Sequence, residues 1–240
     1  VKNIWKFITP ASSLMKIVLQ DKVPTATTNI AFTYHGLQRL GLPALTLQSF
    51  PDEFIMGMNA RRKILGDDKH SSPQHWDKIW KDFENIHIFI SMEARNQADL
   101  ENRYNEIIKL INEKDGIQLL DGHRSQVKDQ TLPYQEASAL YENGIPTPKE
   151  HFGYTDGISN PFFRGMTEEM GYLVGGGKKN GEGNLGYGDP ELESTWAPLE
   201  TGEFILWYRD EAGEYPTAPT PPLISKNGSF MVYSKFHENV

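Results

Sequence analysis

The sequence predicts an α+β fold, because strand-like and helix-like segments alternate over its first half. Residues 28–34 and 85–92 are rich in β-branched and aromatic residues, which is typical of strands. Residues 52–65 and 98–112 place apolar side chains at helical spacing and are followed by glycine. This order of a strand, helices, a strand and a helix is that of a ferredoxin-like α+β unit.

Shorter elements are expected to complete this unit. A short helix is predicted over residues 37–40, just after the first strand. Two short strands, 117–120 and 125–128, are expected on either side of an Asp-Gly turn, and 152–154 is a candidate for one more. Together these elements predict a domain of the dimeric α+β barrel type.

The composition changes from Gly144 onward, where prolines and glycines predict long irregular connections. Strand character returns at residues 203–208 and 230–236. Two strands with no helix between or after them cannot bury a sheet face by themselves, so we expect an incomplete second domain. The predicted organisation is an N-terminal ferredoxin-like domain over 1–165, a Gly-rich connection over 166–201 and the beginning of a second ferredoxin-like domain over 202–240.

Charge and composition exclude several classes of protein. The net charge of −8 argues against a nucleic-acid or anionic-membrane partner. No apolar run approaches the roughly 18 residues of a membrane span. The absence of cysteine excludes disulfides, thiolate metal sites and a cysteine nucleophile. It suits the cytoplasm, while secretion stays an alternative.

One carboxylate stands between glycines in residues 150–165, which read EHFGYTDGISNPFFRG. Gly153 and Gly157 permit a tight turn and a close approach of the backbone to a flat ligand. The surrounding aromatic and aliphatic residues would form an apolar wall beside Asp156, and a carboxylate in such a place can be poised for proton transfer. An ordinary Asp-Gly turn beside buried aromatic side chains is the alternative explanation.

This segment resembles the Gly-x-x-Asp-Gly motif of the dye-decolorizing haem peroxidases, often called DyP-type. Residues 29–42 resemble the family's first strand and its Gly-Leu-x-x-Leu-Gly helix, and 54–67 resemble its Gly-Met-x-x-Arg…Leu-Gly-Asp segment. Residues 202–204 and 227–230 resemble blocks at the start of the family's second domain. The similar blocks occur in the same order as in the family, and they are most like those of its longer, C-type members.

The resemblance implies a peroxidase that binds haem b (iron protoporphyrin IX) between two ferredoxin-like domains. It reduces hydrogen peroxide and oxidises a bulky organic reductant that is dye-like or phenolic. Asp156 would be the distal acid/base, which takes a proton from the peroxide and returns it to the departing oxygen. The candidate haem contacts are Phe152, Gly157, Ile158 and Ser159.

The same resemblance requires a proximal histidine and a distal arginine, both well downstream of the block matched by 227–236. None of the seven histidines matches the proximal position. His151 precedes the distal motif, and His237 falls before the expected place. We therefore expect no metal ligand in this chain and a C-terminal polypeptide that supplies one. A homo-oligomer is left open.

Other interpretations of the sequence are also open. A non-enzymatic ferredoxin-like module for assembly or partner binding could retain the Asp156 motif as a relic. Residues 181–186 satisfy Gly-x-Gly-x-x-Gly, but no helix is predicted to open there, which argues against a dinucleotide site. Trp196, Trp207 and Tyr208 are candidates to relay oxidising equivalents to large substrates, although packing is the commoner role of such residues.

Overall fold

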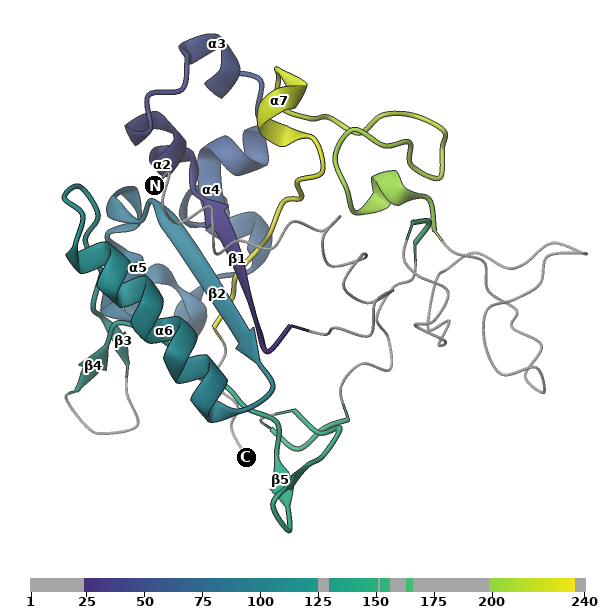
Figure 1. Cartoon of the computed structure of the whole chain (residues 1–240). Coiled ribbons are helices and arrows are strands. Elements are labelled where there is room, and N and C mark those ends of the chain that lie inside the picture. The colour runs from purple at the N-terminus through teal and green to yellow at the C-terminus, as the bar shows by residue number, and fades with distance from the viewer. Residues whose placement is uncertain (1–23, 125–129, 151, 156–162, 166–198, 236–240) are drawn as a thin grey trace, which may run out of the picture. The chain divides into compact units, whose positions relative to one another are not determined.

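The computed structural model describes residues 24–124, 130–150, 152–155, 163–165 and 199–235, and Figure 1 shows their helices and strands. The chain divides into two compact units, Val1–Gln135 (unit 1) and Glu136–Val240 (unit 2). Unit 1 contains the longer helices and strands of the described residues, and unit 2 is built mainly from turns and short elements.

Unit 1 is built on an antiparallel ribbon of β1 (Ala26–Phe32) and β2 (Ile88–Ala94). The register runs from Ala26 opposite Ala94 to Phe32 opposite Ile88. Both predicted strands are confirmed, but their boundaries differ by a few residues because capping and turn residues occupy the predicted ends. The mixture of helices with small antiparallel sheets is an α+β fold, as the sequence predicts.

Helix α6 (Gln97–Asn112) lies along this ribbon (Figure 1) and confirms the second predicted helix. Its N-terminus is capped by Asn96, whose side chain accepts a hydrogen bond from the Asp99 backbone N–H at 2.9 Å. Ile107 and Ile111, one helical turn apart, are buried at 3% and 8% exposure and supply its contribution to the core. None of the helices in the described ranges is both long and apolar enough to cross a membrane.

Between the strands lie α2 (Tyr34–Arg39), α3 (Ala44–Leu47) and α4 (Asp52–Leu65). The prediction of α4 is confirmed in its bounds, although Gly57 interrupts it with φ 68° and ψ 173°. The helix ends at Gly66, whose φ of 79° is a left-handed conformation that glycine adopts without steric cost.

Several short elements complete unit 1. These are the 3-10 helices η2 (Lys69–Ser71), η3 (Pro73–His75) and η4 (Phe83–Asn85), the helix α5 (Lys78–Lys81), and the antiparallel pair of β3 (His123–Arg124) and β4 (Thr131–Leu132). The predicted strand over 117–120 is wrong, since these residues form an irregular connection. The predicted strand over 125–128 lies outside the described residues. The observed pair is shifted because β3 is drawn to Asp77, whose Oδ2 accepts a hydrogen bond from the Arg124 backbone at 3.1 Å.

Unit 2 contains the hairpin of β5 (Tyr141–Glu142) and β6 (Ile145–Pro146), the 3-10 helix η6 (Thr201–Glu203) and the helix α7 (Pro222–Ser225). Asn143 and Gly144 connect β5 to β6 with φ values of 53° and 78°. Positive φ at both central residues is the type I′ geometry that two-residue hairpins favour. The hairpin was not predicted, although the Asn-Gly pair is a strong sequence signal for it.

Three strand predictions in unit 2 are wrong. Residues 152–154 form a turn, and 230–235 form no strand; residue 236 lies outside the described ranges. Residues 203–208 curl instead of extending, because the Gly202 backbone N–H donates to the Arg209 carbonyl at 2.8 Å. Trp207 adopts φ 71° within this curl. The hydrogen bond between Gly202 and Arg209 brings together two residues that an extended strand would hold far apart, so the strand-like composition does not decide the structure here.

Thr33 joins the end of β1 to the chain that leads into β2. Its hydroxyl donates to the Ile86 carbonyl at 2.5 Å and accepts from the Gly36 N–H at 3.0 Å, which caps α2. Its backbone N–H donates to the His87 carbonyl at 3.1 Å. Because Thr33 is the N-cap, β1 ends before it, and α2 begins at Tyr34 rather than at residue 37 as predicted.

Thr33→Ala is expected to lower the free energy of unfolding of the chain by about 1–2 kcal/mol, since a helix cap and a long-range hydrogen bond are lost together. Thr33→Ser keeps the hydroxyl and should stay close to the wild type. Urea unfolding followed by circular dichroism measures both. Equal losses for the two variants would contradict the role of the hydroxyl.

Candidate functional site

The candidate site is the Asp156 motif, and the structure describes the residues on either side of it. Asp156, Gly157, Ile158 and Ser159 lie outside the described residues. Phe152 is described and is 52% exposed in a turn. The functional assignments of these residues therefore stay predictions. The structure describes the chain segments before and after the motif, residues 152–155 and 163–165.

A carboxylate organises the turn that precedes the motif, formed by Glu150 and residues 152–154, which we term the Glu150 turn. Glu150 accepts hydrogen bonds from the backbone N–H groups of Phe152 at 2.7 Å and Tyr154 at 2.9 Å. Its own N–H donates to the Tyr154 carbonyl at 2.8 Å. Gly153 has φ 94°, a conformation that favours glycine at this position. One side chain thus fixes the backbone two residues before Asp156.

The Glu150 turn follows the β5–β6 hairpin directly in the chain, and backbone hydrogen bonds connect the residues that flank the hairpin. The Leu140 N–H donates to the Lys149 carbonyl at 3.0 Å, and the Thr147 N–H donates to the Leu140 carbonyl at 2.8 Å. Lys149 then forms an isolated antiparallel bridge with Thr155, the residue directly before Asp156. Backbone pairings therefore connect the hairpin to Thr155, the residue directly before Asp156.

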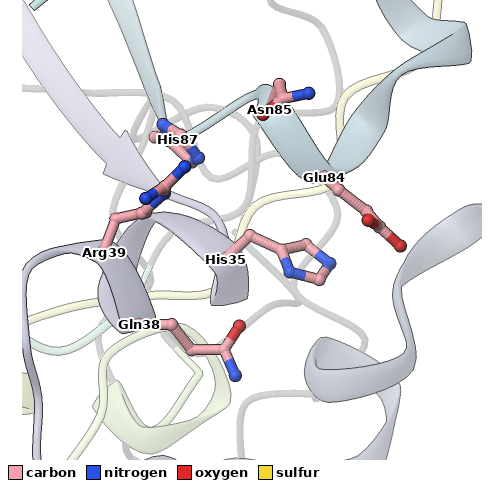
Figure 2. Close-up of a pocket in the computed structure, with 6 residues that line it drawn as sticks. All are labelled: His35, Gln38, Arg39, Glu84, Asn85 and His87. Atoms are coloured by element: carbon pink, nitrogen blue, oxygen red, sulfur yellow. The ribbon is translucent and has the colours of Figure 1, made fainter.

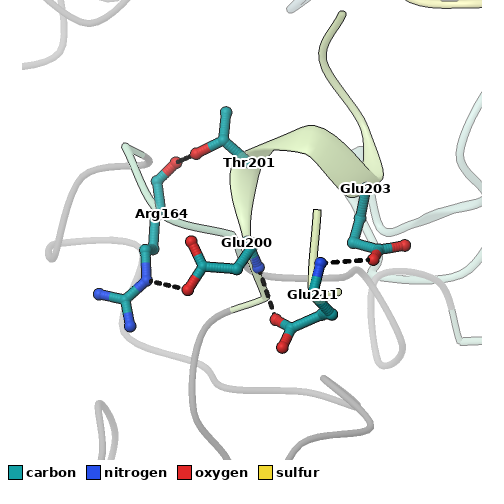
Figure 3. A network of polar contacts seen from close by, with 5 residues as sticks. All are labelled: Arg164, Glu200, Thr201, Glu203 and Glu211. Atoms are coloured by element: carbon teal, nitrogen blue, oxygen red, sulfur yellow. Dashed lines mark hydrogen bonds and ion pairs between the residues drawn. The ribbon is translucent and has the colours of Figure 1, made fainter. Parts of the chain in front are cut away.

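The chain that leaves the motif is held by a second set of contacts, which we term the Arg164 anchor (Figure 3). Phe163 forms a parallel bridge with Leu199, and its ring stacks on Phe204 with centroids 5.0 Å apart. Arg164 Nε donates to Glu200 Oε1 at 2.8 Å, and the Thr201 hydroxyl donates to the Arg164 carbonyl at 2.8 Å. Backbone, aromatic and ionic contacts thus hold Phe163 and Arg164 in place.

Further carboxylates extend this anchor (Figure 3). Glu211 Oε1 accepts from the Glu200 backbone N–H at 2.7 Å, and Glu203 Oε1 accepts from the Glu211 backbone N–H at 3.0 Å. These acidic side chains act as acceptors for backbone donors. The described part of the chain contains no group of three or more histidine, aspartate or glutamate side chains arranged to hold a metal ion.

Residues 206–208, just after the first block that resembles the start of a second domain, contact the second block and the residue Ser225 before it. The Leu206 N–H donates to the Gly228 carbonyl at 2.9 Å, and the Tyr208 hydroxyl donates to Asn227 Oδ1 at 2.7 Å. Trp207 Nε1 donates to the Ser225 hydroxyl at 2.7 Å. Trp207 and Tyr208 are thus both engaged in packing, whereas Trp196 lies outside the described residues. Their role as electron relays stays a prediction.

Sequence reasoning missed Glu150, Arg164 and Glu200 as residues that hold the flanks of the motif. For Glu150 a signal exists, since an acceptor side chain just before a glycine turn can bind the backbone N–H groups that follow it. The pairing of Arg164 with Glu200 spans 36 residues and has no local signal.

Comparison with known proteins identifies the family. Residues 1–125 match the family model described as the DyP dimeric alpha+beta barrel domain, and the chain belongs to this family. A dye-decolorizing peroxidase from Mycena epipterygia is 24% identical over 226 residues, which cover 94% of this chain and 33% of the relative. The structure of an ancestral D-type dye decolorizing peroxidase shares the fold with a TM-score of 0.54 and 21% identity, over 91% of this chain and 39% of that one. The chain thus spans about a third of the length of these relatives.

The DyP family is haem-dependent, and the described residues can be tested for their fit to a haem. Phe152 and Tyr154 are exposed at 52% and 67%, and Leu140 beside Gly153 is exposed at 40%. Exposed apolar side chains at a glycine turn fit one face of a flat apolar cofactor. The described histidines all lie in unit 1, so the Asp156 flanks offer no described iron ligand. The described flanks thus offer apolar contacts to a haem, and no iron ligand is found among their described residues.

Glu150→Ala is expected to accelerate hydrogen exchange of the Phe152 and Tyr154 amides about tenfold or more, since hydrogen bonds to a charged acceptor are lost. Glu142→Ala is the matched control, because among the described residues the Glu142 side chain forms an exposed ion pair with Lys149 at 3.8 Å and no hydrogen bond to the turn. Hydrogen exchange followed by mass spectrometry or NMR measures both variants. Unchanged protection in Glu150→Ala would show that the carboxylate does not hold this turn.

Proposed function

We propose that this chain carries the distal half of the active site of a DyP-type haem peroxidase, which reduces hydrogen peroxide and oxidises bulky organic compounds. The observation that carries the proposal is Asp156 between Gly153 and Gly157 in a chain of the DyP family. The name of the Mycena epipterygia relative supports dye-like compounds as reductants. Phenolic compounds are a second proposed class.

Asp156 acts as the acid/base in this proposal. Its carboxylate accepts a proton from one oxygen of hydrogen peroxide and delivers that proton to the other oxygen, which then leaves as water. The carboxylate is restored in the same sequence, so no net proton remains on Asp156. The Glu150 turn and the Arg164 anchor support this role because they hold the chain on both sides of the motif.

Haem b, when bound, supplies the redox chemistry that cleaves the O–O bond. In this chain we assign its contacts to Phe152, Gly157, Ile158 and Ser159. The glycine lets the backbone come close to the cofactor, and the apolar side chains exclude water from the peroxide site. Exclusion of water strengthens the interaction of a carboxylate with the proton that it exchanges.

The iron ligand is proposed to come from polypeptide outside this chain. The chain spans 33% of its Mycena epipterygia relative, and no described histidine lies in unit 2. The proposed organisation remains a first ferredoxin-like domain over 1–165, a connection over 166–201 and the start of a second domain over 202–240. A homo-oligomer is compatible with this organisation, and the lack of cysteine is compatible with the cytoplasm.

Asp156→Asn in the full-length protein is expected to slow the peroxide-dependent change of the Soret band roughly 100-fold or more, because general acid/base catalysis is lost. Haem content should be unchanged. Stopped-flow spectroscopy measures the rate.

Asp210→Asn is the matched control, since the Asp210 carboxylate, within the described part of unit 2, accepts hydrogen bonds from the backbone N–H groups of Ala212 and Glu214. An unchanged rate in Asp156→Asn would remove Asp156 from the reaction. A full-length protein that neither binds haem nor oxidises dyes would favour a non-enzymatic ferredoxin-like module instead.

A further inference from the structure

A polar pocket lies in unit 1 and is lined by residues that do not belong to the Asp156 motif. It is formed between α2 and the chain that runs from η4 into β2, and it has a volume of about 290 Å³. The six side chains that line it are those of His35, Gln38, Arg39, Glu84, Asn85 and His87. Figure 2 shows them projecting from these two elements around a common space. All six side chains are polar or charged.

The two walls of the pocket are fixed to each other. Thr33, at the start of α2, bonds the carbonyls of Ile86 and His87 through its hydroxyl and its backbone N–H. Gly36 is buried, and a Cβ atom there would clash with the His87 carbonyl. The absence of a side chain at Gly36 therefore lets α2 approach the chain before β2. Because these contacts fix the two backbone segments, the side chains that project from them are preorganised for a ligand.

The polar groups of this pocket are largely uncommitted. The side chains of His35, Gln38, Arg39, Glu84 and His87 make no hydrogen bond or ion pair with any residue in the described ranges. Asn85 donates to Asp82 at 2.8 Å and keeps its amide oxygen for other partners.

We propose that this pocket binds a small oxyanion, a carboxylate or a phosphate, with Arg39 as its principal ligand. The guanidinium group offers parallel N–H donors that match the oxygens of either anion. Gln38 provides a further amide donor, and each histidine provides a ring N–H. Anion binding by these residues does not depend on the proposed peroxidase function.

The charged groups around the pocket determine how it responds to an anion. The titratable groups that face the pocket from α2 are His35 and Arg39, and those from the other wall are Glu84 and His87. Tyr34, through its ring contact with His35, and Asp82, through Asn85, are the nearest titratable neighbours. At neutral pH Arg39 is balanced by Glu84. Glu84 thus opposes an anion in the pocket, while Arg39 attracts one.

The test uses NMR titration of the chain with acetate and, separately, with inorganic phosphate, and chloride serves as the ionic-strength control. The ring C–H resonances of His35 and His87 should shift saturably with one or both oxyanions, assigned by His35→Gln and His87→Gln. His70 and His75 lie in the same unit outside the pocket and should shift only as they do in chloride. The response to acetate or to phosphate identifies which oxyanion is preferred.

Arg39→Gln should weaken binding about tenfold or more, since a charge-assisted hydrogen-bond pair is lost. Arg61→Gln is the control, because Arg61 pairs with Glu53 in α4. Glu84→Gln should strengthen binding at neutral pH. Equal shifts of all four histidines, no saturation with either oxyanion, or an Arg39→Gln chain that binds like the wild type would each overturn the proposal. The titration of the wild-type chain decides the matter even if a variant fails to fold.

Discussion

Unit 1 depends on the close approach of α2 to the chain before β2. Thr33 ends β1, caps α2 and bonds the carbonyls of Ile86 and His87, while Gly36 leaves room for the His87 carbonyl. A β1–β2 ribbon of seven residues per strand has little stability alone, and it gains stability where helices pack on it. The same junction sets the distance between the walls of the polar pocket. One threonine and one glycine therefore determine both the edge of the ribbon and the shape of the pocket.

In the described part of unit 2, hydrogen bonds to carboxylates hold the backbone in place. Glu150 holds the turn before the motif, and Glu200, Glu203 and Glu211 hold the chain after it. Each accepts a hydrogen bond from a backbone N–H or from Arg164. Such bonds fix geometry at modest energetic gain, because Glu203 and Glu211 are exposed to water and Glu150 and Glu200 are only partly buried. This explains how a region with few regular elements keeps a defined backbone on both sides of Asp156.

The sequence predicted the parts of the fold that local pattern determines. The two ribbon strands, α4 and α6 follow from their apolar spacing and from the residues that end them. The strand predicted over 203–208 failed because the bond from Gly202 to Arg209 curls a strand-like segment, and no local pattern indicates that closure. The Asp156 motif was found through family resemblance. Its anchor could not be found, since Arg164 and Glu200 are distant in the chain.

The central claim is that this chain supplies the distal acid/base of a haem site whose iron ligand lies in other polypeptide. Haem titration of the 240-residue chain beside the full-length protein, followed through the Soret band, tests it most directly. The claim predicts a histidine-ligated spectrum and peroxide-dependent dye oxidation for the full-length protein, and weak haem binding with little turnover for the chain alone. A histidine-ligated spectrum with robust turnover from the isolated chain would contradict it.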